Sequence, residues 1–238
     1  TVYRTTQHRS SLVKAKTIIM AKKILALHGL AQSGEYFTSK TKGLRTELEK
    51  SGYEVVYATA PNKYSPADIP DELGAMMQSN PTKDVLAWIE DDLQNKSYSL
   101  PRTSIDYLHD FIIEHGPFEG VLGFSQGAGV AGYLMTDFNG LLNLTIEQQP
   151  PLKFFMVFSG FRFAPERYQK QYEDHPITVP SLHVQGELDT ITEPFKIEAL
   201  YNSCTPETRT FLKHPGGHYV PNSKGFAKKV IEWLNKVE

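Results

Sequence analysis

The chain has 238 residues, of which 40% are hydrophobic and 22% charged, and its formal net charge is −2. This composition fits one large globular domain, and the small net charge provides no general attraction for nucleic acid or for an anionic membrane. A single cysteine, Cys204, excludes an internal disulfide and fits a reducing compartment, and no apolar run approaches the roughly 20 residues that a membrane span needs.

The N-terminal segment 1–22 is basic and contains no acidic residue. Its Lys, Arg, Ser and Thr content resembles that of a mitochondrial presequence, although its apolar positions form only a weak face. We therefore expect a disordered extension over 1–22, followed by one domain over 23–238. The predicted location is the cytoplasm, with the mitochondrion as the alternative, and the oligomeric state is not indicated.

Short apolar runs and amphipathic segments alternate along the rest of the chain. The runs predict strands over 23–27, 54–58, 118–122, 152–158, 181–185 and 208–213. The helical patterns cover 41–50, 103–114, the residues after Ser125, and 225–237. This rhythm predicts an α/β fold with a single doubly wound, mostly parallel sheet of about six strands.

The periodicity fails between Pro61 and Pro101, where five prolines interrupt a segment that still carries apolar side chains. A stretch of this length without periodicity is either a functional lid or an insertion packed on the sheet. If it is a lid, its adaptable apolar residues would line a substrate pocket. The candidates for that role are Met76, Met77, Trp88 and Ile89.

The sequence Gly123-Phe124-Ser125-Gln126-Gly127 has the G-x-S-x-G pattern of a nucleophile elbow. An apolar run precedes it and a helical run of small residues follows it, which is the strand–turn–helix context that the motif requires. In such a turn the serine hydroxyl stands clear of the sheet, and the glycines let the strand and the helix pass closely. Ser125 is therefore the candidate nucleophile.

A serine nucleophile needs a base that takes its proton and an acid that orients the base. After a nucleophile elbow these residues follow in the chain order Ser…Asp/Glu…His. Catalytic residues also lie where the carboxyl ends of the strands meet. The fifth predicted strand ends just before Asp189, with Glu187 as the local competitor for the acid. His218 lies in the glycine-rich loop before the last helix and is the candidate base, whereas His214 fits a packing role better.

The tetrahedral intermediate of acyl transfer requires two N–H donors. One is expected from Gln126, the residue after the nucleophile, at the start of a helix whose dipole favours negative charge. The other is expected from the loop after the first strand, where Leu30 follows Gly29. His28 precedes Ser125 in the chain and is assigned to shaping this loop.

These motifs together resemble the fungal family of serine hydrolases, a branch of the α/β-hydrolases that includes polyketide-releasing thioesterases. The resemblance runs from Lys23 to the C-terminus and rests on the segments 27–34, 116–120, 123–128, 186–189 and 214–218. It implies an α/β-hydrolase fold, a Ser125–Asp189–His218 triad, esterase or thioesterase activity, no cofactor and a cytoplasmic location. The extension over 1–22 is not part of this pattern.

The sequence holds no H-E-x-x-H, no paired cysteines and no phosphate-binding glycine loop, so neither a metal nor a nucleotide cofactor is expected. We predict a hydrolase of carboxylic esters or thioesters with short to medium acyl chains, acting through an acyl-enzyme. The alternatives are an acyl-protein thioesterase or lysophospholipase, and a non-catalytic binding protein on the same fold. The predicted partner is a small-molecule ester or thioester.

Overall fold

The central strands of the protein are short apolar segments whose side chains are shielded from water on both sides. The computed structural model describes residues 22–64, 85–92 and 94–237. Every residue of β7 (Gly120–Phe124) and β8 (Phe154–Phe158) is buried. Strands buried on both faces belong in the middle of a parallel sheet, because only helices on both sides can cover them.

Six parallel strands form the main sheet, in the order β10-β9-β8-β7-β1-β2. The remaining members are β1 (Lys22–Leu27), β2 (Tyr53–Ala58), β9 (Ser181–Gly186) and β10 (Arg209–His214). The α/β fold and the parallel six-stranded sheet expected from the sequence are confirmed. The chain adds β2 on one side of β1 and then crosses to β7 on the other, so the strand order reverses between β1 and β7. Ligands of open α/β sheets bind at such a reversal.

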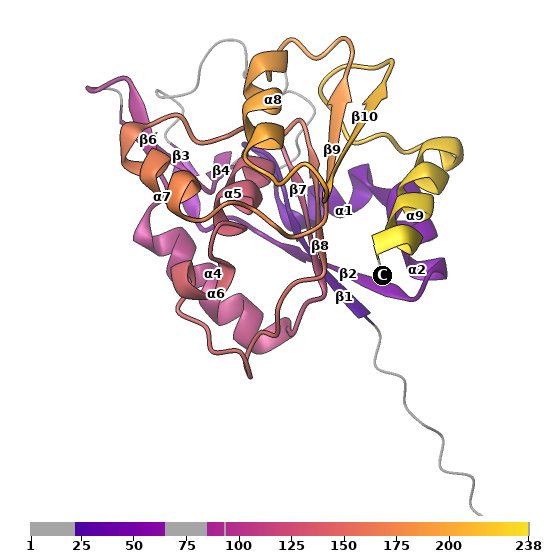
Figure 1. The fold of residues 1–238 in the computed structure, drawn as a ribbon, viewed down its shortest axis with the longest axis horizontal. Coiled ribbons are helices and arrows are strands. Elements are labelled where there is room, and N and C mark those ends of the chain that lie inside the picture. The colour runs from indigo at the N-terminus through magenta and orange to yellow at the C-terminus, as the bar shows by residue number, and fades with distance from the viewer. Residues whose placement is uncertain (1–21, 65–84, 93, 238) are drawn as a thin grey trace, which may run out of the picture.

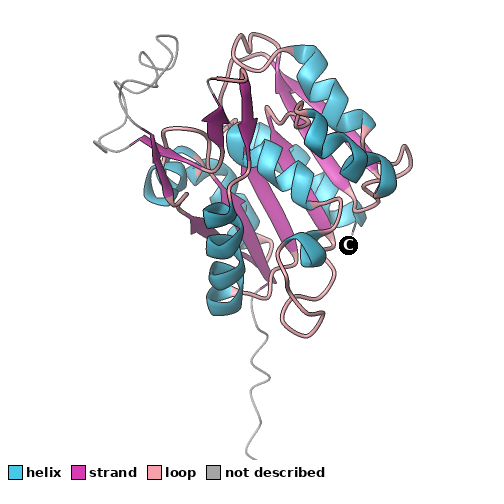
Figure 2. Ribbon diagram, turned by 90° about the vertical axis from the view of Figure 1, so that its left-hand side faces the viewer, coloured by secondary structure: helices cyan, strands magenta, loops and turns pink. Residues whose placement is uncertain are grey.

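Helices cover both faces of the sheet, as Figures 1 and 2 show. One face packs against α1 (Gly34–Lys40), α2 (Lys42–Lys50) and α9 (Lys224–Val237). The other packs against α4 (Arg102–His115), α5 (Gln126–Leu134), α6 (Phe138–Leu141), α7 (Gln169–Asp174) and α8 (Pro194–Asn202). A short 3₁₀ turn, η2 (Glu166–Tyr168), precedes α7.

The alternation of β1 shows how the sequence builds these two layers. Leu25 and Leu27 belong to the core under α4 and α5, whereas Ile24 and Ala26 belong to the core under α2 and α9. Successive side chains of a strand point to opposite faces, so one apolar run supplies both cores. Each large side chain buried in this way contributes about 1.5–3 kcal/mol relative to exposure.

The helix predicted over 41–50 is observed as α2, and Ser33 starts a separate helix, α1, before it. The Ser33 side chain accepts a hydrogen bond from the Tyr36 N–H and so caps α1. Among the described residues no helix is long and apolar enough to cross a membrane. The predicted extension over 1–22 falls outside the described part except for Lys22, which is the first residue of β1.

The described part of the 61–101 segment contains two short antiparallel ladders. β3 (Asn62–Tyr64) pairs with β4 (Val85–Ala87), and β5 (Glu90–Asp92) pairs with β6 (Ser97–Ser99). The segment between β4 and β5 is fastened to the core, because the Trp88 indole N–H donates to the His28 carbonyl and the Ser104 hydroxyl donates to the Trp88 carbonyl. Residues 85–92 therefore pack as a fixed part of the domain, and 65–84 lie outside the described residues.

Candidate active site

Ser125 lies in the sharp turn between β7 and α5, with φ 52° and ψ −116°. Positive φ is strained for a residue with a side chain, and neighbouring packing must hold the residue there. The two flanking glycines make the close passage possible. A Cβ on Gly123 would lie 2.6 Å from the Ala128 Cα, and a Cβ on Gly127 would collide with the carbonyl oxygen of Leu27. The strained turn places the hydroxyl of Ser125 at the carboxyl edge of the sheet.

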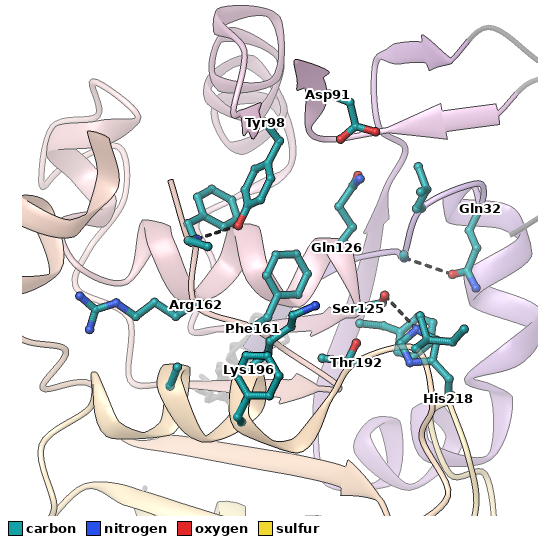
Figure 3. Close-up of a pocket in the computed structure, with 18 of the residues that line it drawn as sticks. Gln32, Asp91, Tyr98, Ser125, Gln126, Phe161, Arg162, Thr192, Lys196 and His218 are labelled. Atoms are coloured by element: carbon teal, nitrogen blue, oxygen red, sulfur yellow. Dashed lines mark hydrogen bonds between the residues drawn. The ribbon is translucent and has the colours of Figure 1, made fainter. Parts of the chain in front are cut away.

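His218 joins the hydroxyl of Ser125 to the carboxylate of Asp189. The Nε2 atom of His218 lies 2.9 Å from Ser125 Oγ, as the dashed line in Figure 3 marks. On the other side of the ring, Nδ1 lies 2.9 Å from Asp189 Oδ2 and 3.1 Å from Oδ1. Because a carboxylate only accepts hydrogen bonds, the ring proton belongs on Nδ1, which leaves Nε2 free to accept the serine proton.

Asp189 is held as an anion by several donors. The Ser159 hydroxyl donates to Oδ2 at 2.6 Å, and the N–H groups of Ile191 and Thr192 donate to Oδ1 at 3.0 and 2.9 Å. Burial by itself raises the pKa of this carboxyl, but the hydrogen bonds from His218, Ser159 and Thr192 outweigh burial and lower the pKa to about 2. Asp189 therefore stays charged at neutral pH, where it orients the imidazole.

Glu187, the competing acid, lies on the surface. Its side chain is exposed, and its backbone N–H continues the sheet by donating to the His214 carbonyl. The side chain of Asp189, in contrast, is fully buried against His218. Of the two acids at the end of β9, only Asp189 meets the histidine.

The other histidines singled out by position have packing contacts. The ring of His28 is buried, with Nδ1 donating to the Gly29 carbonyl and Nε2 accepting from the Ala60 N–H. His214 is buried beside the rings of Tyr219 and Phe226. His28 thus ties the loop after β1 to the loop after β2, which matches the role expected from the sequence.

Leu30 and Gln126, the expected oxyanion donors, both line the cavity into which Ser125 and His218 open. Gln126 is the first residue of α5, and the first N–H groups of a helix have no partner within the helix. The loop that carries Leu30 is braced on both sides, because the Gly29 N–H donates to Gln32 Oε1 and the Ala31 N–H donates to the Leu86 carbonyl. Both expected donors therefore belong to segments that meet at the strand-order reversal between β1 and β7.

The cavity has a volume of about 880 Å³. Aromatic side chains form much of its wall, and Figure 3 shows Phe161 between Ser125 and Arg162, with Tyr98 above them. Its lining comes from the loops after β1, β7, β8, β9 and β10, from β5 and β6, and from α7 and α8. Its volume is in the range of small-molecule binding sites.

Two of the four predicted pocket residues of the 61–101 segment, Trp88 and Ile89, do not line this cavity. Trp88 and Ile89 are 0% and 4% exposed and belong to the hydrophobic core, so assigning them to the pocket was wrong. Apolar character alone does not distinguish a core residue from a pocket residue. Met76 and Met77 lie outside the described residues. From the same segment, Asp91 and Tyr98 reach the cavity instead.

Sequence reasoning also missed Ser159 and the residues that follow it, Phe161 to Ala164. They come directly after β8, so the rule that active residues follow parallel strands could have pointed to them. Ser159 adopts φ 51°, an unusual conformation for serine that no local pattern announces. No group of three or more His, Cys, Asp or Glu able to hold a metal occurs among residues 22–64, 85–92 and 94–237.

A parallel sheet, a serine on a strained turn after a central strand, and an acid and a histidine after the last two strands define an α/β-hydrolase. Solved structures share this fold: acyl-protein thioesterase 2 of Zea mays has a TM-score of 0.59 at 18% identity, over 91% of this chain and 94% of that chain. Esterase PE8 has a TM-score of 0.61 at 19% identity, over 92% and 93%.

Sequence comparisons give the family. The family model "Serine hydrolase (FSH1)" matches residues 18–230, and the chain belongs to this family. It is 62% identical over 222 residues to Family of serine hydrolases 2 of Saccharomyces cerevisiae, covering 92% of this chain and 100% of the relative. It is 44% identical to Family of serine hydrolases 3 of the same yeast, over 91% and 84%. Esterase OVCA2 of Danio rerio is 31% identical, over 91% and 97%. The chain is therefore a serine hydrolase, as the sequence motifs predicted.

Proposed function

We propose that the protein hydrolyses carboxylic esters or thioesters with short to medium acyl chains, and that Ser125, His218 and Asp189 form its catalytic triad. The supporting observation is the continuous hydrogen-bonded relay, in which His218 Nε2 lies 2.9 Å from Ser125 Oγ and Nδ1 lies 2.9 Å from Asp189. A serine hydroxyl becomes a useful nucleophile only when a base within hydrogen-bond reach takes its proton.

In the acylation half of the reaction, His218 removes the proton of Ser125 as Oγ attacks the carbonyl carbon. The carbonyl π electrons move to oxygen, and the N–H groups of Leu30 and Gln126 stabilise the resulting oxyanion. The intermediate collapses when the C–O or C–S bond breaks, and His218 gives its proton to the departing alkoxide or thiolate. Asp189 remains ionised and stabilises the imidazolium.

In the deacylation half, water takes the place of the leaving group. His218 accepts a proton from the water as it attacks the acyl-enzyme, and the second tetrahedral intermediate releases the carboxylic acid and returns the proton to Ser125 Oγ. Acyl chains are expected to lie along the aromatic wall of the cavity, where each buried methylene contributes about 0.8 kcal/mol.

Covalent labelling tests the nucleophile. A fluorophosphonate should add one phosphonyl group to the wild-type protein, detected by intact mass, and peptide mapping should place it on Ser125. The Ser125→Ala variant should remain unlabelled and should lose at least about 10³-fold in kcat toward p-nitrophenyl esters. Ser39→Ala, which removes an exposed hydroxyl bonded only to a helix carbonyl, is the matched control. Labelling of folded Ser125→Ala would identify another nucleophile, and a wild-type protein without labelling or turnover would be a binding protein.

A second candidate is an acyl-protein thioesterase or lysophospholipase, and one observation favours it. Leu188 and Tyr219, which neighbour the triad in sequence, and Phe195 at the cavity are 70%, 51% and 62% exposed. Exposed apolar side chains around a cavity suit a long-chain or macromolecular substrate. Measuring kcat/KM for an S-palmitoylated peptide, for lysophosphatidylcholine and for small p-nitrophenyl esters distinguishes the two candidate functions. A hydrolase of short to medium acyl esters should have a much higher kcat/KM for the small esters.

A further inference from the structure

Arg162 is a charged residue of the cavity that the reaction described above does not use. It follows β8 by a few residues, is half-buried, and lines the same cavity as Ser125. In Figure 3, Ser125 and Arg162 lie on opposite sides of Phe161. Arg162 is therefore placed to contact the part of a substrate that lies away from the reacting carbonyl.

Neutral groups hold the guanidinium in position. Its Nε–H donates to Gln169 Oε1 at 3.1 Å, Nη1 donates to Ser203 Oγ at 3.2 Å, and the group lies 4.5 Å from the centre of the Tyr172 ring. Gln169 is itself fixed, because its amide donates to the Phe163 carbonyl at 2.7 Å. These contacts leave further N–H groups of the guanidinium without an acceptor among the described residues.

No carboxylate neutralises Arg162 within the described part of the chain. Lys196, another cation of the cavity, pairs with Glu193 at 2.9 Å. The acid of the cavity, Asp91, lies near Gln126 in Figure 3, away from Arg162. A half-buried cation without a counter-ion is costly unless a ligand supplies the negative charge. A preoriented guanidinium with free N–H groups matches a planar carboxylate, which can accept two parallel hydrogen bonds.

The wall between the two ends of the cavity is apolar. Phe161, Phe163 and Tyr98 contact one another, with ring centres 5.6 to 6.5 Å apart. The Tyr98 hydroxyl is already engaged, since it accepts the Ala164 N–H at 2.8 Å. A hydrocarbon chain fits this stretch better than a polar one.

We propose that the acyl group of the preferred substrate ends in a carboxylate, which Arg162 binds, while the ester or thioester carbonyl lies at Ser125. The substrate class is thus a monoester or monothioester of a medium-chain dicarboxylic acid. This inference rests on the proposed function, because it requires the acyl chain to start at Ser125.

The test compares esters that differ only in the terminal group. Mono-p-nitrophenyl adipate, suberate and sebacate are matched with p-nitrophenyl hexanoate, octanoate and decanoate, and spontaneous hydrolysis is subtracted. For at least one length, the wild-type kcat/KM for the acid-terminated ester should equal or exceed that for its neutral match. Arg162→Met should lower this acid-to-neutral ratio by about tenfold or more, since a hydrogen bond to a charged group is being removed. An unchanged circular dichroism spectrum and fluorophosphonate labelling of Ser125 would show that the variant is folded.

Arg167→Met is the matched control, because Arg167 is exposed in the nearby 3₁₀ turn η2 and lies outside the cavity lining. Arg167→Met should leave the acid-to-neutral ratio of kcat/KM unchanged. Arg162→Lys should give a ratio between those of the wild type and Arg162→Met, because lysine keeps the positive charge. An unchanged ratio in Arg162→Met would overturn the inference while leaving ester hydrolysis intact. The inference would also be overturned if Arg162→Met lost kcat/KM only toward octanoyl-coenzyme A and not toward octanoyl-N-acetylcysteamine. That result would mean that Arg162 binds an anionic leaving group rather than an anionic acyl group. Failure of the wild type to hydrolyse any ester would instead refute the proposed function.

Discussion

At the scale of single residues, Ser159 has the geometry of a support for the acid. It is 1% exposed, adopts φ 51°, and its hydroxyl lies 2.6 Å from Asp189 Oδ2. It does not line the cavity, so it cannot contact the substrate directly. Its expected effect is to keep Asp189 ionised and correctly oriented toward His218, which is the role of a positioning residue.

We predict that Ser159→Gly lowers kcat about tenfold or more with little change in KM, because it removes a hydrogen bond to a charged group. Ser159→Ala should lower kcat similarly but destabilise the fold more, since alanine tolerates positive φ less well than glycine. Steady-state kinetics and urea unfolding of both variants measure the two effects separately. If kcat followed the loss of stability rather than the loss of the hydroxyl, Ser159 would be only a structural residue.

At the scale of elements, α5 does two things: its first turn holds the oxyanion candidate, and its body supports the cavity wall. The ring of Phe161 packs on Gly129 of this helix, where a Cβ would lie 2.9 to 3.1 Å from three ring atoms. The side chain of Gln126 also fixes the segment between β4 and β5, accepting the N–H of Trp88 at 2.6 Å. The helix α5 thus begins directly after Ser125, supports Phe161 of the cavity wall, and holds Trp88 in place.

Gly129→Ala is expected to displace the Phe161 ring and change acyl-chain selectivity. In a series of p-nitrophenyl esters, kcat/KM of the variant should rise less steeply with chain length than kcat/KM of the wild type. The difference is up to about fourfold for each methylene whose contact with the wall is lost. Acetate-ester turnover should stay within about twofold. Gly225→Ala is the matched control, because a Cβ there meets nothing within 4 Å. Identical chain-length profiles for the two variants would mean that Phe161 does not bound the acyl site.

For the whole molecule, the sequence was sufficient to predict the parallel sheet and the three polar residues that follow its strands, because both depend only on the order of the strands and on where each strand ends. The loops after β7, β9 and β10 bring Ser125, Asp189 and His218 together because the six strands of the main sheet are parallel and share one carboxyl edge. Trp88 shows the limit, since its indole is apolar enough for a pocket but packs in the core. Arg162 was missed because only the folded chain reveals which cation lacks a counter-ion.

Three buried histidines, His28, His183 and His214, make the stability of the domain sensitive to acid, because burial lowers the pKa of each. Burial lowers the pKa of His28 to about 4 and of His183 to about 3, whereas an unfolded histidine titrates near pH 6.5. Unfolding therefore takes up protons below pH 6.5. The stability that comes from keeping these histidines neutral is fully present above pH 6.5. It is lost as the pH falls toward 4 for His28 and toward 3 for His183. Asp189, with a pKa near 2, contributes to acid sensitivity only at lower pH.

We accordingly predict that the free energy of unfolding falls by about 2 kcal/mol for each of His28 and His183 between pH 7 and pH 5. Urea unfolding at the two pH values measures the fall. His183→Gln should reduce the fall by about 2 kcal/mol, because glutamine does not ionise, even if the variant is less stable at pH 7. His175→Gln is the control, since the side chain of His175 is exposed. If His183→Gln and His175→Gln changed the pH dependence equally, acid sensitivity would have to come from groups other than the buried histidine of β9.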